Sequence, residues 1–195
     1  LILEIGGNAM LVRAGALHHD IGKITFPMFF IENQNTGFNP HNEISYEESA
    51  QVIIAHVTNG VKLAYKHSLP EPIIDFIRTH HGTSKTKYFY NRYVAENPDK
   101  PIDQTLFTYK GPRPFSRETA VVMMVDAVEA ASRSLKTHTE SEISKLVDNI
   151  INSQIADEQF SNSDITFKDV DKIKELLKNK LQSIYHVRIE YEIKK

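Results

Sequence analysis

The sequence predicts an all-α fold, and two observations support that prediction. Three segments open with a hydroxyl residue followed three positions later by an acidic residue, the capping box that starts a helix; they begin at Ser45, Thr139 and Thr166. Apolar residues in the last two segments recur at helical spacing, which indicates stripes that face a core. The residues of these stripes are Ile143, Leu146, Val147, Ile150, Ile151, Val170, Ile173, Leu176 and Leu177.

The expected elements follow in order from caps and breakers. Gly22 is the expected C-terminal cap of the first helix, and Gly82 stops the third. Prolines break the chain at 69–72 and favour a new first turn there. Loops are expected at 26–44 and 97–114, and the tail 185–193 is expected to be a helix end or a short strand. The expected helices cover residues 9–21, 45–67, 72–81, 88–96, 116–135, 139–159 and 166–181.

Composition places the chain among ordinary globular domains. Apolar residues make up 41% and charged residues 25%, which is typical of such domains. The absence of cysteine excludes a disulfide partner, a thiolate metal site and a cysteine nucleophile. The net charge of −2 disfavours binding to a nucleic-acid polymer. With 195 residues and no initial Met, we expect one domain that is a fragment of a larger protein.

The sequence contains nine histidines, which is an unusually high number. Four candidate sites stand out among the histidine and aspartate residues. They are His19-Asp20, His56, His80-His81 and Asp126. Each of the histidine positions has a plain alternative. A lone His56 is more often a satisfied or exposed histidine, His80-His81 would complement a helix dipole, and His19-Asp20 would form a local hydrogen-bonded pair.

Asp126 interrupts a strongly apolar segment, 120–128. A carboxylate on a buried helix costs several kcal/mol unless a cation or hydrogen-bond donors receive it. A positive group should therefore face it. An ion pair with Arg133 or Arg117 and a bound metal are both open at this point.

Taken together, these residues form a mixed imidazole and carboxylate set with no thiolate. Such ligands suit divalent first-row metals. One carboxylate can bridge two cations, and two metals about 3.5–4 Å apart can activate a hydroxide for phosphoryl displacement. His56 and His80-His81 lie on successive helices joined by a tight turn, so an antiparallel arrangement can bring them together.

Eight short motifs carry a family resemblance. They are HDIGK at 19–23, NPH at 39–41, SYEESA at 45–50, IAHVTNG at 54–60, LPEPIIDFI at 69–77, THHGT at 79–83, GPRPFSRETA at 111–120 and DAVEAASR at 126–133. Together they resemble the HD-domain metal-dependent phosphohydrolases, and among these the cytoplasmic HD domain of the seven-transmembrane-receptor HD hydrolases. The resemblance implies an HD-type helical bundle that is the cytoplasmic domain of a bacterial inner-membrane protein.

The resemblance also implies an activity and a role for each motif residue. Members of the family that the chain resembles hydrolyse cyclic di-AMP to the linear dinucleotide pApA. The resemblance implies that a hydroxide bridging two divalent transition metals, Fe or Mn, carries out this reaction. Asp20 would be the catalytic bridging ligand and Lys23 would meet phosphate. The first metal would take His19, Asp20 and Asp126, and the second would take Asp20, His56, His80 and His81.

Two further assignments rest on charge and on nearness to Asp126 alone. Arg117 and Arg133 would contact the phosphates of the substrate. For Arg133 the alternative is an ion pair with Glu129, because the two residues are spaced i,i+4 on the expected helix.

The family pattern starts with another histidine on an earlier helix, farther upstream than the eighteen residues before His19. We therefore expect the first metal to lack one ligand. Three alternatives to the cyclic di-AMP hydrolase stay open. They are an HD phosphohydrolase for another nucleotide such as (p)ppGpp or a mononucleotide, a non-catalytic nucleotide-sensing module, and a purely structural helical domain.

Overall fold

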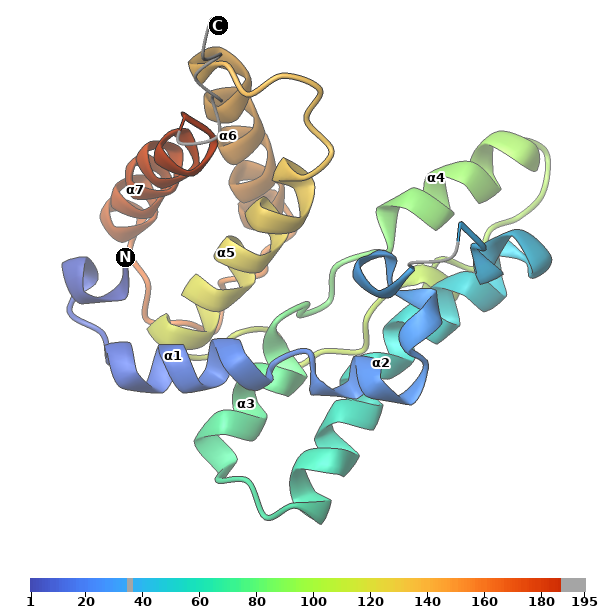
Figure 1. Cartoon of the computed structure of the whole chain (residues 1–195), viewed down its shortest axis with the longest axis horizontal. Helices are drawn as coiled ribbons and strands as arrows, with labels where there is room; N and C mark the ends of the chain where they lie inside the picture. The colour runs from blue at the N-terminus through green and yellow to red at the C-terminus, as the bar shows by residue number, and fades with distance from the viewer. Residues whose placement is uncertain (35–36, 187–195) are drawn as a thin grey trace, which may run out of the picture.

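The computed structural model describes residues 1–34 and 37–186, which form α-helices joined by short 3₁₀ turns (Figure 1). Within these ranges no strand forms, and Lys85 and Thr108 make a single isolated bridge. The all-α prediction is confirmed. The helices are α1 Ala9–His18, α2 Tyr46–Lys66, α3 Glu71–Thr79, α4 Lys87–Glu96, α5 Arg117–Ser132, α6 Glu140–Ala156 and α7 Phe167–His186.

The predicted capping boxes form. At α2, the Ser45 hydroxyl accepts from the Glu48 N–H, and the Glu48 carboxylate accepts from the Ser45 N–H. Thr139 opens α6 with the same reciprocal pair, and Thr166 exchanges two bonds with Asp169 before α7. These local signals fix where the helices begin, which is why the sequence predicted their starts well.

The helices are spread along the molecule, with some at each end and others between the ends (Figure 1). Helices α5, α6 and α7 pack together at one end, α4 lies at the other, and α1, α2 and α3 meet between them. Most residues of the predicted stripes of α6 and α7 belong to the hydrophobic core at this end, together with the 3₁₀ turn Ile2–Ile5 (η1). Leu146 and Leu176 are half-buried and lie outside that core cluster. None of the described helices is long and apolar enough to cross a membrane.

The prediction that Gly22 caps the C-terminal end of the first helix is wrong. Helix α1 ends three residues early at His18, and the chain then enters the 3₁₀ turn Ile21–Thr25 (η2). This turn lies flat against α2, where a Cβ on Gly22 would sit 1.8 Å from the His56 carbonyl oxygen. Glycine is required here for close backbone approach, and the approach carries Asp20 to His56.

The expected loops contain more order than predicted. Segment 26–44 includes the 3₁₀ turns Pro27–Phe29 (η3), Ile31–Asn33 (η4) and Pro40–Glu43 (η5). Segment 97–114 includes Gln104–Phe107 (η6), which buries Phe107 completely. Of the predicted tail, Tyr185 and His186 belong to α7, and the remaining positions lie outside the described residues.

Candidate metal centre

Six predicted ligands come from four elements that meet at the middle of the molecule. His19 and Asp20 directly follow α1, His56 lies in α2 and Asp126 in α5. His80 and His81 follow α3, which packs against both α1 and α2. The structure therefore brings together side chains more than a hundred positions apart in the sequence.

The second group consists of His56, His80 and His81, each of which offers one nitrogen within 4.8 Å of the others. The Nε2 atoms of His56 and His80 lie 3.0 Å apart. The ring centroids of His80 and His81 lie 4.1 Å apart. The predicted antiparallel packing of α2 and α3 thus places three imidazoles around one point.

The first group consists of His19, Asp20 and Asp126, whose ligand atoms also fall within 4.8 Å of one another. The His19 Nε2 lies 3.3 Å from Asp20 Oδ2 and 3.4 Å from Asp126 Oδ1. The group facing Asp126 is therefore a histidine, and neither of the two arginines suggested by the sequence pairs with it.

Asp20 joins the two groups through its two oxygens. Its Oδ2 faces His19, whereas its Oδ1 lies 3.3 Å from the His56 Nε2 and 3.6 Å from the His80 Nε2. A carboxylate that presents one oxygen to each of two ligand groups has the arrangement that bridges a pair of cations.

Backbone carbonyls orient three of the four imidazoles. The Nδ1 atoms of His19, His56 and His80 contact the carbonyl oxygens of Ala16, Ile53 and Ile77 at 2.9, 2.5 and 2.9 Å. Because a carbonyl accepts, each Nδ1 carries a proton, and in the neutral ring the Nε2 is left with a lone pair. These bonds select the tautomer that ligates a metal through Nε2.

This arrangement fits a cation. Two Nε2 lone pairs 3.0 Å apart repel each other, and so do the carboxylates of Asp20 and Asp126, which both face the His19 Nε2. The His19 Nε2 is buried and has no hydrogen-bond partner among the described residues. A divalent cation in each group would turn these repulsions into coordination, and the donor set of imidazole and carboxylate suits Fe, Mn or Zn.

The pKa values differ between the two groups. Burial lowers the pKa of His80 and, together with the neighbouring histidines, lowers that of His81 further, so both rings are neutral and ready to ligate. Burial also opposes charge on His19, but Asp126 and Asp20 outweigh it and raise the pKa of His19 to about 10. In Asp20, burial is outweighed chiefly by His19, which lowers the pKa of its carboxyl well below the usual range.

Lys23 lies beside the bridging carboxylate. Its Nζ is 2.8 Å from Asp20 Oδ2 and 2.6 Å from Glu32 Oε1, and it lies over the ring of Phe30. Burial disfavours the ammonium, but Asp20 and Glu32 outweigh this effect and raise the pKa of Lys23. Lys23 is therefore a fixed positive charge at the edge of the centre, and its contact with phosphate stays a prediction.

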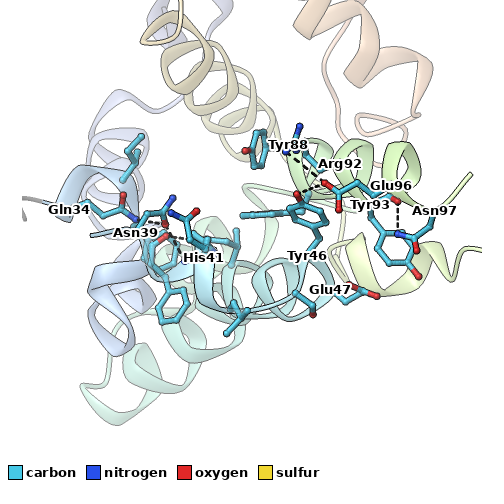
Figure 2. Close-up of a pocket in the computed structure, with 18 of the residues that line it drawn as sticks. Gln34, Asn39, His41, Tyr46, Glu47, Tyr88, Arg92, Tyr93, Glu96 and Asn97 are labelled. Carbon is cyan, nitrogen blue, oxygen red and sulfur yellow. Dashed lines mark hydrogen bonds and ion pairs between the residues drawn. The ribbon is translucent and has the colours of Figure 1, made fainter. Parts of the chain in front are cut away.

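A wide cleft of about 1040 Å³ begins next to the centre. None of the six candidate ligands lines it, but Phe30 does, and the Phe30 ring packs edge-on against the ring of His56. Figure 2 shows Tyr46, Tyr88, Arg92 and Glu96 along its wall, where α4 faces the start of α2. The cleft is far larger than a phosphate group, so there is room beside the centre for a bulky ligand.

The sequence model of the HD domain family matches residues 1–131 of the chain. The chain belongs to the HD domain family. The match confirms the resemblance seen in the motifs, and all six candidate ligands lie within the matched residues.

Similar proteins narrow the relationship further. The chain is 40% identical over 188 residues to the cyclic-di-AMP phosphodiesterase PgpH of Listeria monocytogenes and 42% identical over 187 residues to that of Bacillus subtilis. Each alignment covers 96% of this chain and 26% of the relative, so the chain spans about a quarter of their length. The crystal structure of the L. monocytogenes PgpH HD domain in complex with cyclic-di-AMP superposes with a TM-score of 0.89 at 39% identity, covering 93% of this chain and 84% of that chain.

Arg117 and Arg133 lie away from the ligand atoms of this HD domain. Arg117 donates to the carbonyl of Ile5 at 2.7 Å and pairs with Asp164. Arg133 forms the i,i+4 ion pair with Glu129 at 2.8 Å that was the alternative interpretation. Both guanidinium groups have protein partners, so phosphate contact by either arginine stays a prediction.

Sequence reasoning missed Tyr109, Phe30 and Glu32. Tyr109 is buried, its ring stacks on His81 at 4.2 Å, and burial raises its pKa. Phe30 covers His56, and Glu32 holds Lys23. All three come from segments expected to be loops, where no periodic pattern marks a residue as part of a site.

Proposed function

We propose that this HD domain is a metal-dependent phosphodiesterase that hydrolyses cyclic di-AMP to linear pApA. The observation that carries the proposal is Asp20, which presents one oxygen to each of the two ligand groups. The relatives named cyclic-di-AMP phosphodiesterase support the substrate, and so does the similar HD domain in complex with cyclic-di-AMP.

Each of the two ligand groups would hold one metal ion. His19 and Asp126 would hold one divalent cation, His56, His80 and His81 the other, and Asp20 both. When bound, the cations supply an activated water and neutralise charge on the phosphate. Fe or Mn is proposed on the imidazole and carboxylate donor set.

The remaining work falls to residues of the chain. The backbone carbonyls behind His19, His56 and His80 keep the rings oriented, so little reorganisation accompanies the reaction. Lys23 would offset the negative charge that develops on the phosphate. The large cleft beside Phe30 supports a dinucleotide over a mononucleotide, because a mononucleotide would leave most of that space unfilled.

The test is hydrolysis by the purified chain in the presence of Mn²⁺. Cyclic di-AMP, cyclic di-GMP, (p)ppGpp and a mononucleotide would be incubated separately, with EDTA-treated protein as control, and products separated by chromatography. We expect pApA from cyclic di-AMP only in the metal-loaded sample. Tight binding without product would favour a nucleotide-sensing module, and preferred turnover of (p)ppGpp would favour the other enzymatic alternative.

The same reasoning extends to the parent protein. We propose that residues 1–195 form one HD phosphohydrolase domain, supported by η1 at the start of the chain packing into the core of α5, α6 and α7. We also propose that this domain is the cytoplasmic part of a larger, membrane-anchored bacterial protein. The much greater length of the PgpH relatives supports that assignment.

A further inference from the structure

His81 is held differently from the other three imidazoles of the centre. No described residue makes a hydrogen bond to either ring nitrogen of His81, whereas His19, His56 and His80 each have a carbonyl behind the ring. Packing against Tyr109 and His80 and the backbone of the turn that follows α3 are what set its position. The direction of the His81 ring therefore depends on how rigid that turn is.

Gln159, which is distant in the sequence, makes hydrogen bonds to this turn. Gln159 is 1% exposed, and its Oε1 accepts from the Thr83 N–H at 2.9 Å. Its Nε2 donates to the Thr83 hydroxyl at 3.0 Å and to the Asp157 carbonyl at 3.1 Å. The Thr83 hydroxyl also lies 3.3 Å from Gln159 Oε1. Both ends of the amide are thus used, and three of its four contacts hold the residue two positions after His81.

Gly82 shows how closely the amide and the turn fit. Its φ is +50°, and a Cβ there would lie 2.3 Å from Gln159 Oε1. Arg113 adds a third connection, donating from Nε to the Thr83 hydroxyl at 3.2 Å. Ser84 then donates back to the His81 carbonyl through its N–H and its hydroxyl at 3.0 and 2.7 Å. The bonds run from Gln159 through Thr83 to the backbone of His81.

We infer that Gln159 is a positioning residue for the second metal, acting on His81 through the Gly82-Thr83 turn. The inference rests on the proposed function, because it needs a cation held by His56, His80 and His81. Its physical basis is that outer residues which fix a ligand typically change metal affinity by 10–100-fold when removed. Gln159 matches no motif of the sequence, and it lies beyond the residues matched by the family.

The experiment compares two buried glutamines of the same region. Gln159→Leu removes every bond to Thr83 while keeping a side chain of similar size. Gln154→Leu is the control, since Gln154 is also buried and donates to the Met123 carbonyl at 3.3 Å but does not touch the turn. Both are made in an Asp126→Asn background, which weakens the first group, and Mn²⁺ binding and thermal unfolding are measured.

We expect Gln159→Leu to weaken Mn²⁺ at the second group about tenfold or more and Gln154→Leu to leave it unchanged at a similar loss of stability. Gln159→Glu keeps an acceptor for the Thr83 N–H, so it should restore part of the affinity and covers the case in which the leucine variant unfolds. Equal Mn²⁺ affinity in all three folded variants would overturn the inference alone. Absence of any bound metal in the unaltered chain would overturn the proposed function and this inference with it.

Discussion

The Nε2 atoms of His56 and His80 lie 3.0 Å apart, while the Nδ1 atom of each ring faces a carbonyl of the preceding turn. Neither Nε2 has a proton to donate, because the carbonyls require it on Nδ1. The contact is unfavourable as it stands and becomes favourable around a cation. The metal preference of this HD domain is thus built into backbone hydrogen bonds as well as into the choice of histidine.

Asp20 should be the residue least able to tolerate change. Asp20→Asn removes the charge shared by both groups, so we expect hydrolysis to fall by more than about a hundredfold, because even outer residues of metal sites cost 10–100-fold. His56→Ala and Asp126→Ala should have comparable effects. His138→Ala is the control, since His138 stacks on Tyr185 away from the centre. Near-normal turnover by Asp20→Asn would count against a two-metal reaction.

The two groups should bind metal unequally. The second group has three imidazoles and Asp20, whereas the first has His19, Asp20 and Asp126 only. We expect calorimetric titration with Mn²⁺ to show two phases, with Asp126→Asn weakening the looser phase and His56→Ala the tighter one. A single phase, with equal affinity at both groups, would show that three ligands suffice for the first metal.

Metal binding at the first group should depend on pH. The pKa of His19 is raised to about 10, so His19 carries a proton at pH 7 that a cation must displace. We expect release of about one proton per cation bound there and tighter binding as the pH rises toward 10. His80 and His81 have lowered pKa values and should release none. Calorimetry at pH 7 in two buffers of different ionisation enthalpy measures this, and equal heats in both would contradict it.

The same shift affects the stability of the metal-free chain. The folded pKa of His19 lies above its ordinary value of 6.5, so its contribution to stability is complete below pH 6.5 and is lost as the pH rises through about 10. Urea unfolding of EDTA-treated protein at pH 6 and pH 10 should show this loss, and His19→Gln should remove it. An unchanged pH dependence in that variant would exclude His19 as its source.

Gly22 should tolerate no side chain. In Gly22→Ala the new Cβ would meet the His56 carbonyl oxygen at 1.8 Å and the Gly60 nitrogen at 2.5 Å, which are backbone atoms that cannot turn aside. We expect a loss of about 2–3 kcal/mol or more in the free energy of unfolding together with weaker metal binding. Gly37→Asn is the matched control, because a Cβ on Gly37 would meet no atom within 4 Å among the described residues outside its chain neighbours, and Asn tolerates its positive φ.

Substitutions at Lys23 and Arg117 should affect different properties, catalysis for Lys23 and stability for Arg117. Lys23→Met removes the charge beside Asp20, and we expect kcat to fall about a hundredfold. Arg117→Met removes the bond to the Ile5 carbonyl, and we expect a lower Tm with kcat nearly unchanged. A large rise in KM for Arg117→Met at unchanged Tm would instead support the predicted contact with substrate.

The sequence predicted the starts of the helices well because Ser45, Thr139 and Thr166 form caps from residues three positions apart. It misjudged Gly22, since the reason for glycine there is the backbone of α2, which lies more than thirty positions away. The six candidate metal ligands came from the family motifs, and the structure brings them into two neighbouring groups. Tyr109 and Gln159 were missed because their roles come from tertiary contacts with His81 and Thr83 that no local pattern encodes.

Anomalous diffraction from crystals of the Mn²⁺-loaded chain tests the central claim most directly. We expect two peaks about 3.5–4 Å apart, one among His56, His80 and His81 and the other between His19 and Asp126, with one Asp20 oxygen on each. The peak among His56, His80 and His81 should be the stronger. A single peak that leaves Asp20 uncoordinated, or no peak among these histidines, would contradict it.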